Sequence, residues 1–392
     1  MAVFNNRHFL TLQRFQLFSF CLYFVFNFVD RGLSNIFLLL TLFLCLVSFR
    51  NFCDVLKTKV KLIICILLFS VYISLVGYYH DSPISELDNY YRFLLLLPLL
   101  LISLDDYVIS RILPISALAA IILWFYDVGT SEIYIRRYTG TSSSAITYAI
   151  MSSTLSMVCL FYAFKKNTRS LSLILSAVIF MYIYIQTETR GPMIGIIIVV
   201  GYLTYEFTGG SRDKKSMIIS FLVVLSIIAS VITIEHPLTT RLKDIAKINL
   251  TEPSLIKEES LRERTYYINY GLQEIQKKLG FGIGPQNVVS HMSRDIQKNG
   301  YKKISPRDHL HNDFLDIVLK FGFMSILLLL SIYYFLLDRS NKEHHILLNI
   351  LMIMLVTSQL TQSHLSHHQA ITFFVTLFYV LQTKSIQPKV LK

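Results

Sequence analysis

Long runs of apolar residues, separated by short polar segments, follow one another along the whole 392-residue chain. Many runs hold about 17 to 22 residues, and a helix of that length crosses about 30 Å of hydrocarbon. The pattern predicts an all-α polytopic membrane protein with about twelve transmembrane helices in one integral membrane domain, residues 1–392. We expect these helices at 15–29, 33–49, 61–79, 92–104, 107–126, 143–164, 170–187, 191–208, 216–234, 313–337, 344–362 and 369–383.

Lys and Arg gather in short segments between alternate runs, whereas most of the opposite short segments are poor in them. The positive-inside rule therefore places both termini in the cytoplasm. The N-terminal stretch has basic residues before an apolar run but no small-residue cleavage site, so we interpret it as an uncleaved first helix.

Composition agrees with a membrane protein and argues against two other classes. Hydrophobic residues make up 53% of the chain and charged residues 16%, a balance typical of proteins in a bilayer. The net charge of +12 is spread over the loops, so topology explains it better than binding of nucleic acid does. The five cysteines form no CxxC pair, and we expect neither a disulfide nor a zinc site.

One polar segment, residues 235–312, is much longer than the others, and the topology places it in the periplasm between the ninth and tenth helices. Long loops in compact bundles are usually functional. Within it, residues 260–278 have apolar positions near helical spacing, which predicts an amphipathic helix on the membrane surface. The turn with Gly280, Gly282 and Gly284 ends that helix.

Arg190 in QTETRGPMIG stands at the mouth of an apolar helix that begins with Gly191 and Pro192. A guanidinium beside a helix N-terminus makes a good anion site. An interfacial Arg that reaches toward lipid headgroups would show the same pattern.

Four further arginines are candidates for substrate binding. Arg262 and Arg264 begin the loop helix and can present a second cation to the same anion, although exposed arginines on such helices are often only solvated. Arg136 and Arg137 lie in the third periplasmic loop and can meet a charged substrate. Their spacing alone distinguishes none of these roles.

The stretch SPRDHLHNDFLDIVLKFGFMS, residues 305–325, places His309, His311 and Asn312 directly before the tenth helix. A neutral imidazole suits removal of a proton from a sugar hydroxyl near pH 7, and Asn312 can orient the ring or a substrate. Polar residues that merely cap a helix would give the same pattern. We expect no metal here, because the His-x-His spacing directs the two side chains apart. His364, His367 and His368, in the last periplasmic turn, either line the same cavity or lie at the interface.

Three local motifs together resemble the bacterial O-antigen ligase family, and more loosely the O-antigen polymerases of the same superfamily. His311-Asn312 followed by Gly322 resembles the family's H-N-x9-G signature, with Ser325 at a position that often holds Gly, Thr or Tyr. Arg264 and Leu272, followed by Gly282 and Gly284, resemble its R-x7-L…GxG stretch, with Ile268 replacing a frequent Trp. TETRGP around Arg190 resembles the family's Thr-Arg-Gly/Ala start of a helix.

The resemblance implies a GT-C-like inner-membrane glycosyltransferase without cofactors. Its donor would be polysaccharide on undecaprenyl diphosphate, its acceptor a hydroxyl of lipid A-core, and its active site would face the periplasm among membrane lipids. Arg190 and Arg264 would hold the diphosphate, and His311 would activate the acceptor. No carboxylate is obviously placed as a nucleophile, so we expect a one-step, inverting transfer.

Two alternatives stay open. A polymerase of the same superfamily would transfer to another lipid-linked repeat unit, and local motifs do not separate it from a ligase. A flippase or transporter of a lipid-linked anionic glycan would need no catalysis. Transporters usually carry charges near the membrane midplane and show inverted repeats. Here the apolar runs are nearly free of charge at their centres, and the candidate site residues gather at one face.

Overall fold

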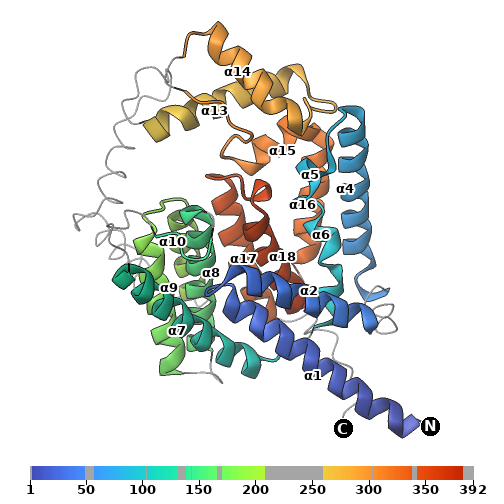
Figure 1. The fold of residues 1–392 in the computed structure, drawn as a ribbon, viewed down its shortest axis with the longest axis vertical. Helices are drawn as coiled ribbons and strands as arrows, with labels where there is room; N and C mark the ends of the chain where they lie inside the picture. The colour runs from blue at the N-terminus through green and yellow to red at the C-terminus, as the bar shows by residue number, and fades with distance from the viewer. Residues whose placement is uncertain are drawn as a thin grey trace.

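The computed structural model describes residues 2–48, 57–102, 104–130, 138–142, 144–165, 170–207, 259–301, 304–337 and 342–382, and within these ranges it is helical without strands (Figure 1). The predicted helix at 216–234 and the pair Arg136 and Arg137 lie outside the described residues. The N-terminal helices are α1 (Ala2–Phe26), α2 (Arg31–Val47), α4 (Val60–Tyr79), α5 (Ile84–Leu87), α6 (Arg92–Leu95), η1 (Leu97–Leu101) and α7 (Asp106–Thr130). The remaining helices are α8 (Ala145–Phe164), α9 (Leu171–Gln186), α10 (Pro192–Phe207), α13 (Glu259–Lys277), η3 (Pro285–Asn287), α14 (Val288–Lys298), α15 (Asp313–Phe321), α16 (Phe323–Leu336), α17 (Lys342–Gln359), η4 (His364–Ser366) and α18 (His368–Gln382).

Three described helices, α4, α7 and α8, are long and apolar enough to cross a membrane. Five shorter segments are also apolar: Arg31–Val47, Arg92–Leu101, Leu171–Gln186, Pro192–Phe207 and Phe323–Leu336. The all-helical class is therefore confirmed for the described part of the chain. The count of about twelve spans stays a prediction.

Helix α8 forms the centre of the bundle, because nearly all of its residues are buried. Small residues, such as Ala149, Ser152 and Ser156, let neighbouring helices approach closely. The Ser152 hydroxyl donates to the Tyr148 carbonyl oxygen at 2.7 Å, and the Ser156 hydroxyl donates to the Ala177 carbonyl oxygen of α9 at 2.8 Å. These bonds satisfy hydroxyl groups that would otherwise be costly in an apolar core.

Three predicted helices differ from the structure. The prediction of one continuous helix at 313–337 was wrong, because Gly322, with a φ of +83°, separates α15 from α16. The helix expected at 92–104 is a single α-helical turn followed by the 3-10 helix η1, in which Pro98 lacks the donor that a longer α-helix needs. The first helix begins at Ala2, well before the predicted 15.

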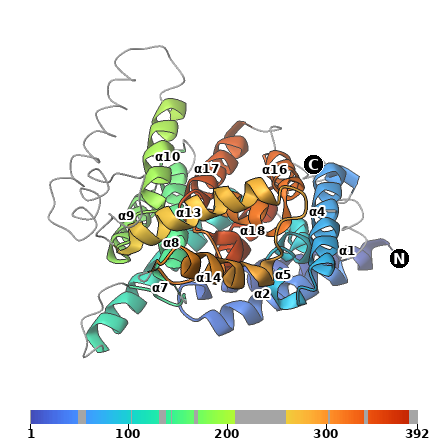
Figure 2. The ribbon, with the colours of Figure 1, turned by 90° about the horizontal axis from the view of Figure 1, so that it is seen from above.

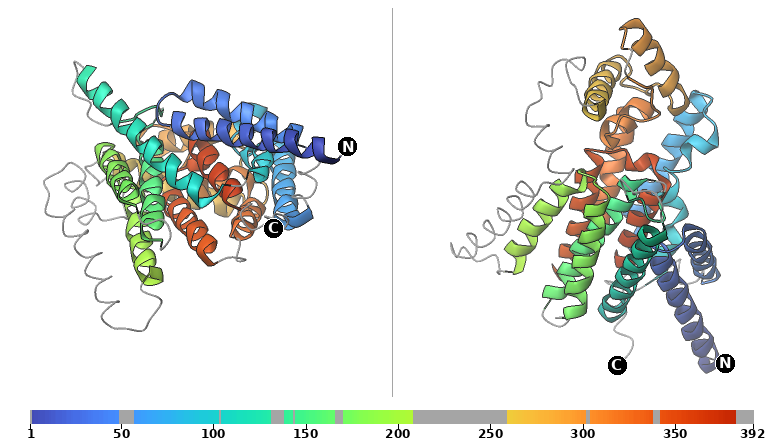
Figure 3. Two further views of the ribbon diagram at one scale, coloured as in Figure 1. Left: turned by 90° about the horizontal axis from the view of Figure 1, so that it is seen from below. Right: turned by 60° about the vertical axis from the view of Figure 1, so that its left-hand side comes forward.

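Helices α13 and α14 lie across the top of the bundle in Figure 1. Figure 2 shows the same pair from above, and the right panel of Figure 3 shows it after a turn of 60° about the vertical axis. The two helices have their own small core, which contains Tyr266, Tyr267, Val288, Met292 and Leu310. The helix predicted at 260–278 is present as α13, while its place on the membrane surface stays a prediction. We call α13, α14 and their connection the helical cap.

Backbone hydrogen bonds tie the helical cap to the break between α15 and α16. The Ile283 amide donates to the Leu319 carbonyl oxygen at 2.8 Å, and the Phe323 amide donates to the Leu279 carbonyl oxygen at 3.0 Å. A Cβ atom on Gly282 or Gly322 would overlap backbone atoms of the facing segment. The glycines of the GxG stretch and of the H-N-x9-G motif thus meet at one crossing.

Candidate active site

Four parts of the chain meet on the side of the helical cap that faces the bundle: helix α13 of the cap, the loop 304–312, the turn 360–367 and the start of α10. Each contributes one or more side chains that the sequence singled out. The helix break at Gly322 lets α15 sit at the end of the bundle, so the loop before it reaches the turn after α17.

Helix α15 is anchored at its N-terminus by Asn312, whose side-chain oxygen accepts from the Leu315 amide at 3.1 Å. The same side chain donates through Nδ2 to the Leu360 carbonyl oxygen at 3.1 Å. Both ends of Asn312 are therefore used to cap α15 and to fix the turn. Of the two roles that the sequence left open, this geometry matches helix capping.

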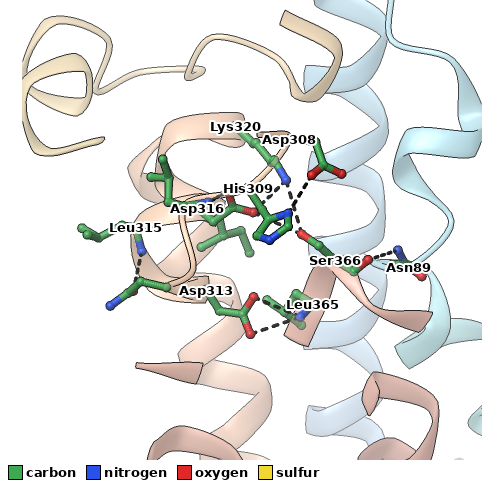
Figure 4. Close-up of polar contacts among 12 residues, drawn as sticks. Asn89, Asp308, His309, Asp313, Leu315, Asp316, Lys320, Leu365 and Ser366 are labelled. Carbon is green, nitrogen blue, oxygen red and sulfur yellow. Dashed lines mark hydrogen bonds and ion pairs between the residues drawn. The ribbon is translucent and has the colours of Figure 1, made fainter. Parts of the chain in front are cut away.

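Two buried carboxylates on α15 hold the loop and the turn together (Figure 4). Asp313 accepts from the Leu365 amide at 3.0 and 3.1 Å. Asp316 accepts from the Leu310 amide at 3.1 Å, and Lys320 pairs with it at 2.7 Å, with both side chains almost fully buried. A buried ion pair keeps its place only when further donors share the charge. The Ser366 hydroxyl supplies one at 3.3 Å.

His311 lies in an unusual backbone conformation, with a φ of +56°. This left-handed conformation costs a residue other than glycine roughly 1–3 kcal/mol, so surrounding contacts must hold it. The ring forms a 2.9 Å hydrogen bond between Nδ1 and the side-chain oxygen of Gln362, and its centroid lies 5.6 Å from that of Tyr267. Because the amide oxygen only accepts, Nδ1 carries the proton and Nε2 keeps a lone pair.

The electrostatic surroundings favour the neutral form of this imidazole. Burial lowers the pKa of His311 to about 4, and the nearby His309 and Arg264 also contribute. Arg307 adds a further positive charge with the same direction of effect. His311 is therefore neutral at physiological pH and able to accept a proton.

The expectation that the His-x-His spacing directs the two side chains apart was wrong, because His311 has a left-handed backbone and the segment is not extended. His309 lies next to His311, with the two ring centroids 4.6 Å apart in an edge-to-face arrangement. Its Nδ1 is bonded to the Asp308 carboxylate at 2.7 Å. His367, from the turn before α18, lies 5.7 Å from His309, and burial lowers its pKa to about 4. The sequence left open whether this last turn lines the site or lies at the membrane interface, and the position of His367 supports the first interpretation.

Arg264 and Arg262 are both half-buried on α13. Two positions along a helix turn the side chains by about 200° relative to each other, so they leave the helix in different directions. Arg264 is close enough to lower the pKa of His311 through its charge. The structure thus brings Arg264 to the histidine, while binding of substrate by Arg262 stays a prediction.

Arg190 is half-buried at the start of α10, where its carbonyl oxygen accepts from the Met193 amide at 3.1 Å. The next residue, Gly191, is packed so closely that a Cβ atom would lie 2.7 Å from the Thr361 hydroxyl and 4.0 Å from Gln362 Cγ. Since Gln362 also bonds His311, the helix that follows Arg190 touches the residue that orients the histidine. The segment that holds Arg190 therefore adjoins the turn that contacts His311.

Four residues of this site were missed by the sequence analysis: Gln362, Tyr267, Asp308 and Arg307. Gln362 lies 51 positions after His311 and belongs to no recognisable motif. Asp308 and Arg307 stand inside the SPRDHLHND stretch, and their proximity to two histidines was an available signal. Tyr267 donates to the Ser305 carbonyl oxygen at 2.8 Å and so fixes the loop from the side of α13.

Within the described ranges, no group of three or more His, Cys, Asp or Glu side chains is arranged to hold a metal ion. The four described cysteines, Cys21, Cys45, Cys65 and Cys159, carry free thiols.

Comparison with known families supports the motif assignment. Residues 171–330 match the family model described as O-antigen ligase. The matched range contains Arg190, Arg264, His309, His311 and Asn312, and ends before Gln362. No curated protein matches the chain.

Proposed function

We propose that this protein is a ligase of the O-antigen ligase superfamily, because residues 171–330 match the family model described as O-antigen ligase. It would transfer O-polysaccharide from undecaprenyl diphosphate to a hydroxyl of lipid A-core during lipopolysaccharide biosynthesis. The observation that carries this proposal is the neutral His311 with Gln362 on one ring nitrogen and Arg264 nearby.

In this proposal His311 is the general base. The hydrogen bond from Nδ1 to Gln362 leaves Nε2 to take the proton of the acceptor hydroxyl. As the hydroxyl oxygen attacks the anomeric carbon, the bond from that carbon to the diphosphate oxygen breaks. The undecaprenyl diphosphate leaves with the bonding electron pair, and one displacement inverts the anomeric configuration.

The arginines stabilise the negative charge that grows on the leaving diphosphate. Arg264 is close enough to His311 to lower the pKa of that histidine, and Arg190 stands at the N-terminus of α10, where the helix dipole adds positive potential. Fixed cations of this kind supply transition-state stabilisation without a metal ion. Metal independence is part of the proposal and is tested below.

We also propose that the site faces the periplasm of the bacterial inner membrane and that both termini are cytoplasmic. Ion pairs between helix ends support this orientation. Lys165 after α8 bonds Asp106 at the start of α7 at 2.5 Å and Glu343 at the start of α17 at 2.8 Å. The topology predicted from basic residues puts all three ends on the cytoplasmic side, opposite to His311.

Reconstitution tests the proposed activity. The purified protein is placed in liposomes with undecaprenyl-diphosphate-linked O-polysaccharide and lipid A-core, in the presence of EDTA. We expect a lipopolysaccharide ladder on a gel. If lipid-linked units lengthen instead, the protein is a polymerase; if lipid only crosses the bilayer and no glycan is transferred, it is a transporter.

A further inference from the structure

Four histidines, His311, His309, His367 and His368, lie close to one another, and we call them the histidine row. His309 lies edge-to-face with His311, His367 lies beside His309, and His368 follows His367 in the chain. The row joins two segments far apart in sequence, the loop before α15 and the turn before α18. Its members beyond His311 are half-buried, so molecules can reach them from the surface.

Arg31, the first residue of α2, stands at the far end of this row. Its guanidinium donates to Nε2 of His368. The neighbouring Arg92 pairs with Asp88 at 2.8 Å, so these two charges largely cancel. Arg31 therefore supplies the net positive charge near His368, and it also lowers the pKa of that histidine.

An arginine is uncommon at this place in the predicted topology. Arg31 lies in the short turn between the first and second helices, which the positive-inside rule assigns to the outer side. Short outer turns are usually poor in Lys and Arg, so a partly buried one needs a reason. Contact with His368 is one reason, and attraction of an anion is a second.

The chemistry of the row suits a sugar. Imidazole rings offer hydrogen-bonding nitrogens to hydroxyl groups, and their flat faces pack against a sugar ring. Arg31 at the end offers a fork of donors that fits phosphate or carboxylate. Arg264 and Arg307 lie close to His311 as well, and the proposed donor diphosphate occupies that cationic part of the site.

We propose that His309, His367, His368 and Arg31 form the binding site for an acceptor glycan that carries an anionic group. We call these four residues the acceptor track. The acceptor hydroxyl would meet His311 at one end, while a phosphate of the acceptor would bind Arg31 at the other. This inference rests on the proposed function, because it assumes that His311 activates the acceptor.

The experiment compares wild type with Arg31→Gln and Arg31→Lys in the reconstituted assay, with lipid A-core that retains its phosphates. Loss of a charge-assisted hydrogen bond should raise the KM for the acceptor about 10- to 100-fold. The KM for the donor and the maximal rate should stay within about twofold, since Arg31 touches neither. Arg31→Lys keeps the charge and should recover part of the loss.

Arg111→Gln is the matched control. Arg111 is an exposed arginine on α7, stacked over Tyr107 with 5.0 Å from the guanidinium carbon to the ring centroid. Its substitution should change neither KM. A second comparison uses lipid A-core treated with phosphatase, which should bind wild type and Arg31→Gln equally.

Three results would overturn the acceptor track: an unchanged acceptor KM, an equal rise in the donor KM, or the same loss with the phosphatase-treated acceptor. If wild type lengthens lipid-linked units instead, the ligase proposal fails on its own. The Arg31 comparison then runs with the lipid-linked unit as acceptor, and the same KM criteria apply. Binding of labelled lipid A-core to wild type and Arg31→Gln in nanodiscs gives a readout independent of turnover, and equal binding would contradict the track.

Discussion

The loop 304–312 and the turn 360–367 meet at His311, and they are built in opposite ways. The loop is rich in ionisable groups, with Arg307, Asp308 and His309 close together, and it holds His311 at a φ of +56°. The turn offers mainly neutral polar groups, among them Gln362 and the Leu360 carbonyl oxygen. The loop thus carries the reacting group, and the turn holds that group in place.

This division explains why α15 needs two buried carboxylates. Asp313 binds the turn through the Leu365 amide, and Asp316 binds the loop through the Leu310 amide. Each carboxylate satisfies backbone donors that would otherwise be buried without a partner. One short helix therefore sets the distance between the base and the residue that orients it.

The largest expected effect comes from the reacting group itself. His311→Ala removes the proposed base and should lower the transfer rate about 10²- to 10⁴-fold, the usual contribution of general base catalysis. The rate is measured by ladder formation in the reconstituted system. His291→Ala, a histidine substitution on α14 of the helical cap, is the control and should keep the rate. Retained activity in His311→Ala would show that His311 is not the general base.

Arg264→Gln should have the next largest effect. Loss of one fixed cation at a developing anionic charge costs about 10²- to 10³-fold in rate by analogy with oxyanion donors. Lys277→Gln, an exposed cation at the other end of α13, is the control and should behave as wild type. A rise in donor KM with an unchanged maximal rate would mean that Arg264 holds the donor equally in the ground state and the transition state.

Gln362→Leu tests the turn without changing any charge. The variant loses the bond to Nδ1 of His311, so the ring is no longer fixed in one orientation or tautomer. We expect a maximal rate about 10- to 100-fold lower, with the KM of the donor little changed. Gln362→Glu keeps an acceptor for the Nδ1 proton and should recover much of the rate. Equal losses in both variants would mean that Gln362 contributes packing only.

Tyr267→Phe should have the smallest effect. It removes the 2.8 Å hydrogen bond to the Ser305 carbonyl oxygen but keeps the ring beside His311. One such hydrogen bond contributes a net free energy of about 0.5–1.5 kcal/mol to the position of the loop, so its loss predicts a rate reduction of roughly two- to tenfold. The control is Tyr266→Phe, because the Tyr266 hydroxyl donates to Asp295 within the helical cap. Initial rates of the two variants then distinguish an effect on the loop from an effect on the cap.

The sequence predicted the loop side of the site better than the turn side, for physical reasons. His311 precedes an apolar helix, and α13 shows a clear amphipathic period, so both are local signals. Gln362 reaches His311 only through the packing of distant helices, which no local pattern records. The break at Gly322 was missed because apolar residues continue on both sides of it, and only its positive φ separates α15 from α16.

The most direct test of the central claim, that His311 is a base in the field of Arg264, is the pH dependence of the transfer rate. Burial and neighbouring positive charge lower the pKa of His311 to about 4, so wild type should lose activity only as the pH falls toward 4. Removal of a positive neighbour raises this pKa, so the acid limb of Arg264→Gln should move to higher pH. An acid limb near 6.5 in wild type, or an identical limb in both proteins, would contradict the account.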